Sequence, residues 1–116
     1  MNITRVKYLI WAADLDRATE FYTTVFGAEV TRKIPTVLTE LTLCDAIIGI
    51  HGGGEGKKTW TGLTFETTDV IEGAKEIVSA GGTLTREPEW EDGEPPHLAM
   101  CVDPDGNEIM LTRRRS

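Results

Sequence analysis

Apolar and polar residues along the chain predict strands and helices in a regular order. Residues 3–13 alternate between two faces, which is typical of a strand, and residues 14–27 carry apolar side chains at helical spacing. Three β-prone runs follow, at residues 28–34, 36–44 and 46–51. The first half of the chain therefore predicts a strand, a helix and three further strands.

The same order returns after a glycine-rich segment at residues 52–58. We interpret this segment as a linker rather than a phosphate-binding loop, because no helix start and no Gly-Lys-Ser/Thr sequence follows it. The elements predicted beyond it are a strand, a helix and three strands, at residues 60–68, 69–82, 83–87, 97–102 and 107–113. The second half thus repeats the pattern of the first.

The spacing of helix boundaries supports an internal repeat. Asp14 and Asp69, each a good helix N-cap, are 55 positions apart, and Gly27 and Gly82, which end the helices, have the same separation. Such agreement is typical of a duplicated unit. We expect one α+β domain over residues 1–116, with module one at 1–51, the linker at 52–58 and module two at 59–116.

The net charge of the chain limits the kinds of molecule that we expect it to bind. The 116 residues carry a formal net charge of −7, and three of the twelve basic residues are clustered at Arg113–Arg115. An acidic body repels phosphate backbones, so we expect no nucleic-acid partner.

Composition also predicts where the protein works. No apolar run is long enough to span a bilayer, and the N-terminus lacks the apolar core of a signal peptide, so no membrane partner is expected. Cys44 and Cys101 show no Cys-x-x-Cys spacing. We expect a cytoplasmic protein with reduced thiols.

Three short motifs carry a family resemblance. Residues 13–18, followed by Phe21-Tyr22 and Phe26-Gly27, resemble the opening of the vicinal oxygen chelate superfamily, which includes glyoxalase I, extradiol dioxygenases and bleomycin resistance proteins. Residues 65–70 resemble its second strand–helix junction, and residues 103–107 its last hairpin. The resemblance covers the whole chain. It implies a cavity formed by two curved four-stranded sheets, helices on their outer faces, and a homodimer that in some members exchanges modules.

The resemblance also assigns four positions to metal ligands. In this chain they hold Lys7, Gly49, Gly62 and Met110, none of which is a ligand for a hard metal ion. The ammonium of Lys7 would also repel a cation. We therefore expect no metal and no other cofactor.

One alternative metal site stays open. His51 and His97 would have to converge with a carboxylate such as Glu40 or Glu66. Nothing in their spacing supplies that convergence. The other interpretation makes His51 a wall residue of the cavity and His97 a residue at the edge of a loop.

Strand alternation and the resemblance together predict the lining of the cavity. It mixes apolar and aromatic side chains with a few polar groups, as small-molecule pockets do, and consists of Lys7, Leu9, Trp11, Gly49, His51, Trp60, Gly62, Thr64, Glu66 and Met110. Trp90, in the acidic loop 88–96, is predicted at the cavity mouth, where it would hold a planar cation by stacking. The alternatives are a collapsed core and a Trp90 that lies on the surface.

Three functions remain. The first is a metal-free binding protein that sequesters a planar or cationic drug-like compound, as the antibiotic resistance members of the superfamily do. The second is a metal-independent isomerase or lyase that uses Lys7, His51 or Glu66 as acid or base. Lys7 is otherwise an ammonium paired with Glu66 or another carboxylate. The third is a subunit or regulatory module without a small ligand.

Overall fold

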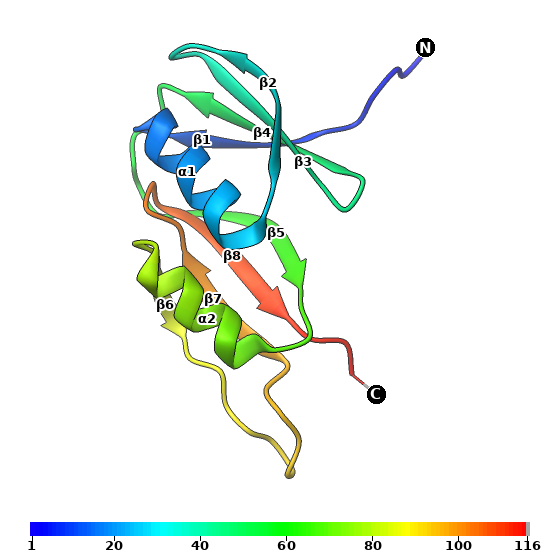
Figure 1. Ribbon diagram of the computed structural model, residues 1–116, viewed down its shortest axis with the longest axis vertical. Coiled ribbons are helices and arrows are strands. Elements are labelled where there is room, and N and C mark those ends of the chain that lie inside the picture. The colour runs from blue at the N-terminus through cyan, green and yellow to red at the C-terminus, as the bar shows by residue number, and fades with distance from the viewer. Residues whose placement is uncertain (116) are drawn as a thin grey trace.

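The computed structural model describes residues 1–115 and contains two βαβββ modules (Figure 1). Ser116, the last residue of the predicted module two, lies outside the described residues. Module one contains β1 (Tyr8–Ala12), α1 (Leu15–Phe26), β2 (Glu29–Ile34), β3 (Leu38–Leu43) and β4 (Ala46–Gly52). Module two contains β5 (Thr59–Glu66), α2 (Val70–Ser79), β6 (Thr83–Arg86), β7 (Leu98–Val102) and β8 (Asn107–Thr112). The predicted α+β class and element order are confirmed.

Each module builds one mixed four-stranded sheet. The strand orders are β1-β4-β3-β2 and β5-β8-β7-β6. β1 is parallel to β4, β5 is parallel to β8, and the other pairs are antiparallel. In Figure 1 the modules form the upper and lower halves of the molecule, with α1 and α2 next to each other on one side. One helix packs on one face of each sheet, so each sheet keeps a helix-free face.

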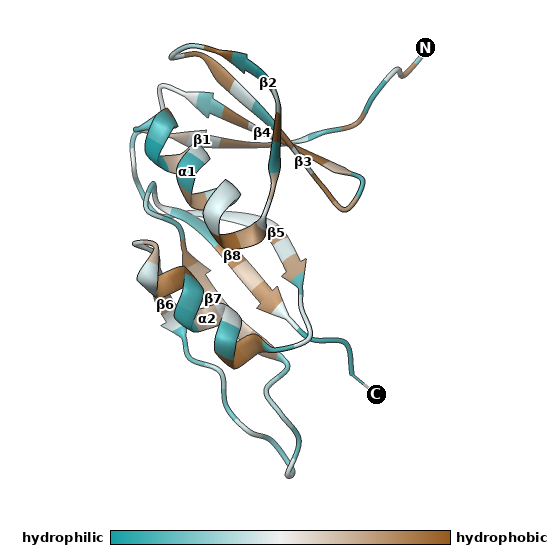
Figure 2. Ribbon diagram, viewed as in Figure 1, coloured by the Kyte–Doolittle hydropathy of each residue, from teal (hydrophilic) through white to brown (hydrophobic). Residues whose placement is uncertain are grey.

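The helices begin where the sequence predicts. The carboxylates of Asp14 and Asp69 accept hydrogen bonds from the backbone N–H groups three residues ahead, and Gly27 ends α1 in the left-handed conformation with φ of 71°. Both helices show hydrophobic and hydrophilic residues on different sides, whereas the loop between β6 and β7 is largely hydrophilic (Figure 2). Within residues 1–115, neither helix is long and apolar enough to cross a membrane.

Two predicted details of these elements are wrong, and the predicted end of α2 is confirmed. β1 starts at Tyr8 rather than Ile3, because its ladder with β4 begins at the pair of Tyr8 and Ile48. α2 ends at Ser79 with Ala80 as its C-cap, and Gly81 follows with φ of 100°, so the helix stops at the two glycines. Val78, predicted in the apolar stripe, is 50% exposed, because it lies about 100° around the helix from Ile77, which the core buries.

A turn of module two is fixed to α1 of module one by buried polar groups. The Tyr22 hydroxyl donates to Asp103 Oδ2 at 2.6 Å, and Arg17 Nη2 donates to Asp105 Oδ1 at 2.8 Å. Burial raises the pKa of both Tyr22 and Asp103. The two modules are therefore held in one arrangement by specific hydrogen bonds as well as by apolar packing.

The two cysteines form no disulfide. Cys44 is exposed in the turn between β3 and β4, and Cys101 is buried in β7. Burial raises the pKa of the Cys101 thiol to about 11, so this group stays protonated at neutral pH.

Candidate ligand-binding site

The helix-free face of module one brings five of the predicted residues together. Leu9 lies opposite Gly49 and Trp11 opposite His51 in the parallel pair of β1 and β4, and Lys7 precedes Leu9 on the same face. Leu9 is 42% and Trp11 50% exposed. Within one chain, this face is accessible and is not a collapsed core.

At the centre of this face lies a cluster of three charged residues, Arg5, Lys7 and Glu40, which we call the Glu40 cluster. Glu40, in β3, is 1% exposed. Its Oε2 accepts hydrogen bonds from Lys7 Nζ at 2.8 Å and from Arg5 Nη2 at 2.9 Å, while Oε1 accepts one from Arg5 Nη1 at 3.0 Å. The Lys7 hydrogen bond is the main reason why the pKa of Glu40 is lowered. Burial opposes this shift, and the Arg5 guanidinium adds to it.

Gly49 makes this cluster possible. It pairs with Glu40 on one side and with Leu9 on the other, so it lies between the two strands that the Lys7 side chain must bridge. A Cβ at this position would lie 2.9 Å from Leu9 Cδ1 and 3.9 Å from Lys7 Cδ. The missing side chain thus leaves the path along which Lys7 reaches Glu40.

The carboxylate that Lys7 binds was not identified from the sequence, which offered Glu66 or an unnamed acid. Glu40 was considered only as a metal ligand. The signal in the sequence is its position, since it is the one charged residue in the β-prone run 36–44. Strand alternation also puts Arg5 on the same side as Lys7, and the sequence predicted no role for Arg5.

His51 is held in a defined orientation at the end of the same face. Its Nδ1 lies 2.6 Å from the carbonyl oxygen of Gly52, and its ring lies against Trp11 with centroids 4.3 Å apart at 43°. A carbonyl only accepts, so Nδ1 carries the proton and Nε2 is the acceptor nitrogen of the neutral ring. His51 therefore offers a hydrogen-bond acceptor beside an exposed indole.

A cavity of about 470 Å³ lies between β1, β5 and the linker. Leu9, Trp11 and Trp60, three of the predicted residues, line it together with Tyr8 and the backbone of residues 53–57. Trp60 is 55% exposed. The volume is in the range of small-molecule sites. Leu9 connects this cavity to the Glu40 cluster, because it also covers Gly49.

The helix-free face of module two is different in character. Gly62 lies at a bulge of β5 with φ of 73°, a conformation that favours glycine, and the ladder with β8 is interrupted there. Met110 of β8 lies between Thr64 of β5 and Met100 of β7. No ion pair like that of Glu40 forms at this centre among the described residues.

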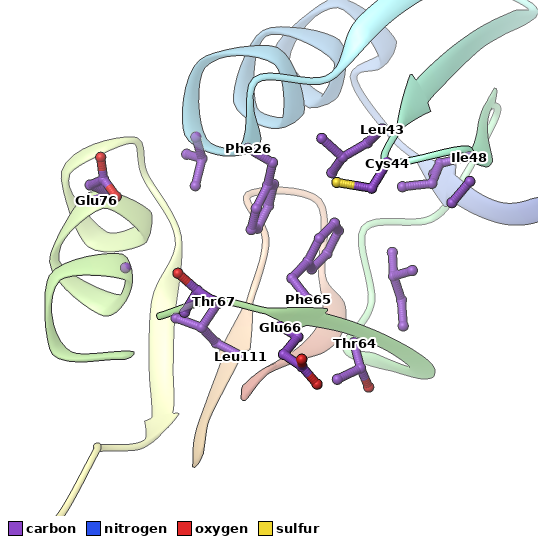
Figure 3. Close-up of a pocket in the computed structure, with 14 residues that line it drawn as sticks. Phe26, Leu43, Cys44, Ile48, Thr64, Phe65, Glu66, Thr67, Glu76 and Leu111 are labelled. Carbon is purple, nitrogen blue, oxygen red and sulfur yellow. The ribbon is translucent and has the colours of Figure 1, made fainter. Parts of the chain in front are cut away.

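A second cavity, of about 510 Å³, is lined by Thr64 and Glu66 and by none of the other predicted residues (Figure 3). It lies between the modules, beside stacked rings of Phe26 and Phe65 whose centroids are 3.8 Å apart. Glu66 also lies 3.5 Å from Arg114 Nε. Sequence reasoning missed this cavity, because it depends on how the end of α1 meets β5.

The remaining predicted residues lie apart from the module one face. His97 Nε2 is 3.3 Å from Glu94 Oε2, and its Nδ1 is 3.3 Å from Arg113 Nη2. Trp90 is 62% exposed and lines a smaller hollow with the start of α2 and Arg113. His51 and His97 therefore do not share a carboxylate, and Trp90 does not lie beside Trp11.

The profile of the Glyoxalase/Bleomycin resistance protein/Dioxygenase superfamily matches residues 4–111. The chain belongs to this superfamily. Among curated relatives, a probable lactoylglutathione lyase of Vibrio cholerae is 29% identical over 123 residues, covering 92% of this chain and 88% of that protein. A lactoylglutathione lyase of Arabidopsis thaliana is 32% identical over 121 residues, or 87% of this chain, which spans only 41% of the plant protein.

Solved structures of superfamily proteins share the fold. The fosfomycin resistance protein FosX of Listeria monocytogenes matches with a TM-score of 0.80 at 19% identity, covering 100% of this chain and 94% of that one. The lactoylglutathione lyase of Agrobacterium tumefaciens matches with a TM-score of 0.70 at 19% identity, covering 97% and 96%. Another FosX structure, with a TM-score of 0.76 at 20% identity and coverage of 96% and 90%, is a complex with Mn(II).

The residues that the resemblance assigns to the ligand positions of the superfamily do not have side chains that fit a metal ion. Lys7 donates and cannot coordinate while protonated, Met110 offers a thioether, and the two glycines offer no side chain. Both oxygens of Glu40 already accept hydrogen bonds from cations. Among residues 1–115, no three His, Cys, Asp or Glu side chains are grouped closely enough to hold an ion.

Proposed function

We propose that this protein binds a small organic molecule on the helix-free face of module one and that it needs no resident metal ion to do so. The Glu40 cluster carries this proposal. Side-chain cations already neutralise the buried carboxylate at the point where the resemblance places a divalent ion. Exposed apolar and aromatic side chains adjoin the cluster, which suits retention of an organic ligand.

The proposed ligand is planar. Trp11 and Trp60 offer exposed aromatic surfaces on the same cavity, and such rings favour stacking partners. A positive charge on the ligand, which the acidic loop around Trp90 suggested, is not supported, because Trp90 lies in a different hollow. Sequestration of a toxic compound, and with it antibiotic resistance, is the proposed biological role. The similarity in fold to FosX, a fosfomycin resistance protein, favours it.

We also propose that the protein is a homodimer. Leu9, Trp11 and Trp60 leave about half of their surface exposed at the edge where β1 and β5 meet, and clustered exposed apolar residues mark interaction sites. A second copy would cover these side chains and enclose the ligand. Light scattering during size-exclusion chromatography should give twice the mass of one chain.

A ligand-binding experiment tests the proposed function directly. A panel of planar aromatic compounds is titrated in a buffer that contains EDTA, with ligand-observed NMR as the readout. At least one compound should bind at one per chain, and Trp11→Ala should weaken it. Trp90→Ala is the matched control, since this tryptophan is also exposed but lies elsewhere. Binding that requires an added divalent metal would contradict the proposal.

His51 favours a second candidate, a metal-independent lyase or isomerase. Its Nε2 is free to accept a proton because Nδ1 is fixed on Gly52, which is the orientation that a general base needs. Lys7 is bound to Glu40, and Glu66 lies in the other cavity, so neither is the better candidate. An assay of lactoylglutathione lyase activity in EDTA, with His51→Gln as the inactive variant, tests this function. No turnover by the unaltered protein would refute it for this substrate.

A further inference from the structure

The helix-free face of module one has the opposite charge from the protein as a whole. The chain carries −7, yet Arg5 and Lys7 both bind the single carboxylate of Glu40. Arg32 pairs with Glu40 in the ladder of β2 and β3 and so shares its face. The other acid that the register places on this face is Glu29, opposite Thr42. Three cations and two carboxylates leave an excess of one positive charge.

Lys7 is the member of the Glu40 cluster next to Leu9 on the strand face, and it keeps donors for another molecule. The Arg5 guanidinium uses two of its five N–H donors on Glu40, and the Lys7 ammonium uses one of its three. The Lys7 side chain is 35% exposed and Glu40 is fully covered. An approaching anion would therefore meet the ammonium and not the carboxylate.

We infer that the Lys7 ammonium, held by Glu40, anchors a carboxylate group of the ligand, whose planar apolar part then lies along Leu9 toward Trp11. This inference rests on the proposed function and names its ligand class, an aromatic carboxylic acid. A charge-assisted hydrogen bond in a half-buried setting is strong enough to select for such a group. Glu40 fixes the ammonium in advance, so that little side-chain freedom is lost on binding.

The apolar surface beside the ammonium suits this ligand class. Lys7 reaches Glu40 across Gly49, and a Cβ at Gly49 would lie 2.9 Å from Leu9 Cδ1 and 3.9 Å from Lys7 Cδ. Leu9 therefore lies next to the Lys7 side chain, where it can contact the ring of a ligand whose carboxylate binds the ammonium. Leu38 adds to the apolar floor, because its Cδ1 would lie 3.7 Å from a Cβ at Gly49.

The test compares three probe compounds that differ in charge, namely 2-naphthoate, 2-naphthamide and 2-naphthylmethylammonium. Affinities for the unaltered protein are measured by ligand-observed NMR in EDTA at low salt. We expect 2-naphthoate to bind at least about tenfold more tightly than the other two, the low end of what a hydrogen bond to a charged group supplies. Equal affinities, or a preference for the ammonium, would overturn the inference while the proposed function stands.

Variants then assign the preference to Lys7. Lys7→Met should remove it, lowering the affinity for 2-naphthoate about tenfold and leaving that for 2-naphthamide within about twofold. Lys7→Gln, which keeps a donor for Glu40 without the charge, serves if Lys7→Met does not fold. Lys33→Met is the matched control, because Lys33 lies beside Asp16 on the α1 side and its loss changes the net charge equally. An equal weakening by Lys33→Met would overturn the inference.

These experiments distinguish a failure of the proposed function from a failure of the carboxylate anchor at Lys7. If none of the three probes and no other planar compound binds, the proposed function is wrong and the inference falls with it. If 2-naphthamide binds and its affinity matches that of 2-naphthoate, only the carboxylate anchor is wrong. If Lys7→Met weakens both probes by the same factor, Lys7 shapes the site but does not recognise charge, which also overturns the inference.

Discussion

The two modules have the same topology but opposite chemistry at the centre of their helix-free faces. Module one brings together Lys7, which directly precedes β1, Gly49 of β4 and Glu40 of β3, and module two places Gly62, Met110 and Met100 at the equivalent positions. The repeat spacing of 55 relates Lys7 to Gly62, and the matching ladders relate the other two pairs. One copy of a duplicated unit thus holds a charged cluster while the other is apolar, which shows that the fold does not fix the chemistry of its face.

The largest expected effect on stability comes from replacing Gly49 of module one by methionine, the residue at the equivalent position (Met110) of module two. Gly49→Met adds a side chain whose Cβ alone would lie 2.9 Å from Leu9 Cδ1, and it blocks the path of Lys7 to Glu40. Overpacking of this kind costs about 1–3 kcal/mol in the free energy of unfolding. Urea unfolding followed by circular dichroism measures it. Met110→Leu, a change of shape at similar volume in module two, should cost less, and equal costs would remove the contrast.

The next effect concerns the bulge of β5, which the corresponding strand β1 of module one does not have. Gly62→Ala places a side chain at φ of 73°, which costs about 1–2 kcal/mol although no atom lies closer than 3.7 Å to the added Cβ. Thermal unfolding measures the loss. Thr68→Ala, at an exposed threonine just after β5, should change the stability by no more than about 0.5 kcal/mol. If Gly62→Ala is as neutral as this control, the bulge does not hold the conformation described here.

The smallest expected effect is a difference in the response of two buried acids to pH. The pKa of Glu40 lies below its ordinary value of 4.5, chiefly through the Lys7 hydrogen bond, so its stabilising contribution is present above pH 4.5 and is lost as the pH falls through the lower folded value. Burial raises the pKa of Asp103 above 3.8, so its ionisation opposes folding and acidification through the raised value favours the native state.

Two variants separate these opposite signs in melting temperatures measured from pH 7 to pH 3. The difference between the unaltered protein and Glu40→Gln should shrink below pH 4.5, because the native advantage of the carboxylate disappears there. The unaltered protein should gain relative to Asp103→Asn as the pH falls toward 3.8. Parallel curves for both variants would show that neither carboxyl contributes as described.

Local signals predicted most of the architecture. The carboxylates of Asp14 and Asp69 cap their helices within three residues, and Gly27 takes its left-handed conformation for a reason internal to the chain. Such interactions involve residues that are close in the sequence, so they can be recognised from the sequence alone. Counting the distance between the two caps was then enough to predict the duplicated βαβββ unit.

The site was predicted less completely, because its contacts join distant residues. Strand alternation placed Leu9, Trp11 and Gly49 on one face. The choice of Glu40 as partner for Lys7, 33 residues away in the sequence, depends on β3 lying beside β4. Alternation also assigned Thr64 the correct face of β5 without showing that it opens toward a different cavity. The position of Trp90 followed from the path of a long loop, which no periodic pattern describes.

The docking of residues 103–107 onto module one determines how the protein responds to cleavage of the chain between the two modules. Asn107 Nδ2 donates to the backbone carbonyl of Trp11 at 2.7 Å, close to the hydrogen bond between Tyr22 and Asp103. Separating the halves would exchange these hydrogen bonds for bonds to water, a loss of about 0.5–1.5 kcal/mol each. A protease that cuts within the glycine-rich linker should therefore yield two fragments that stay associated and unfold as a single unit.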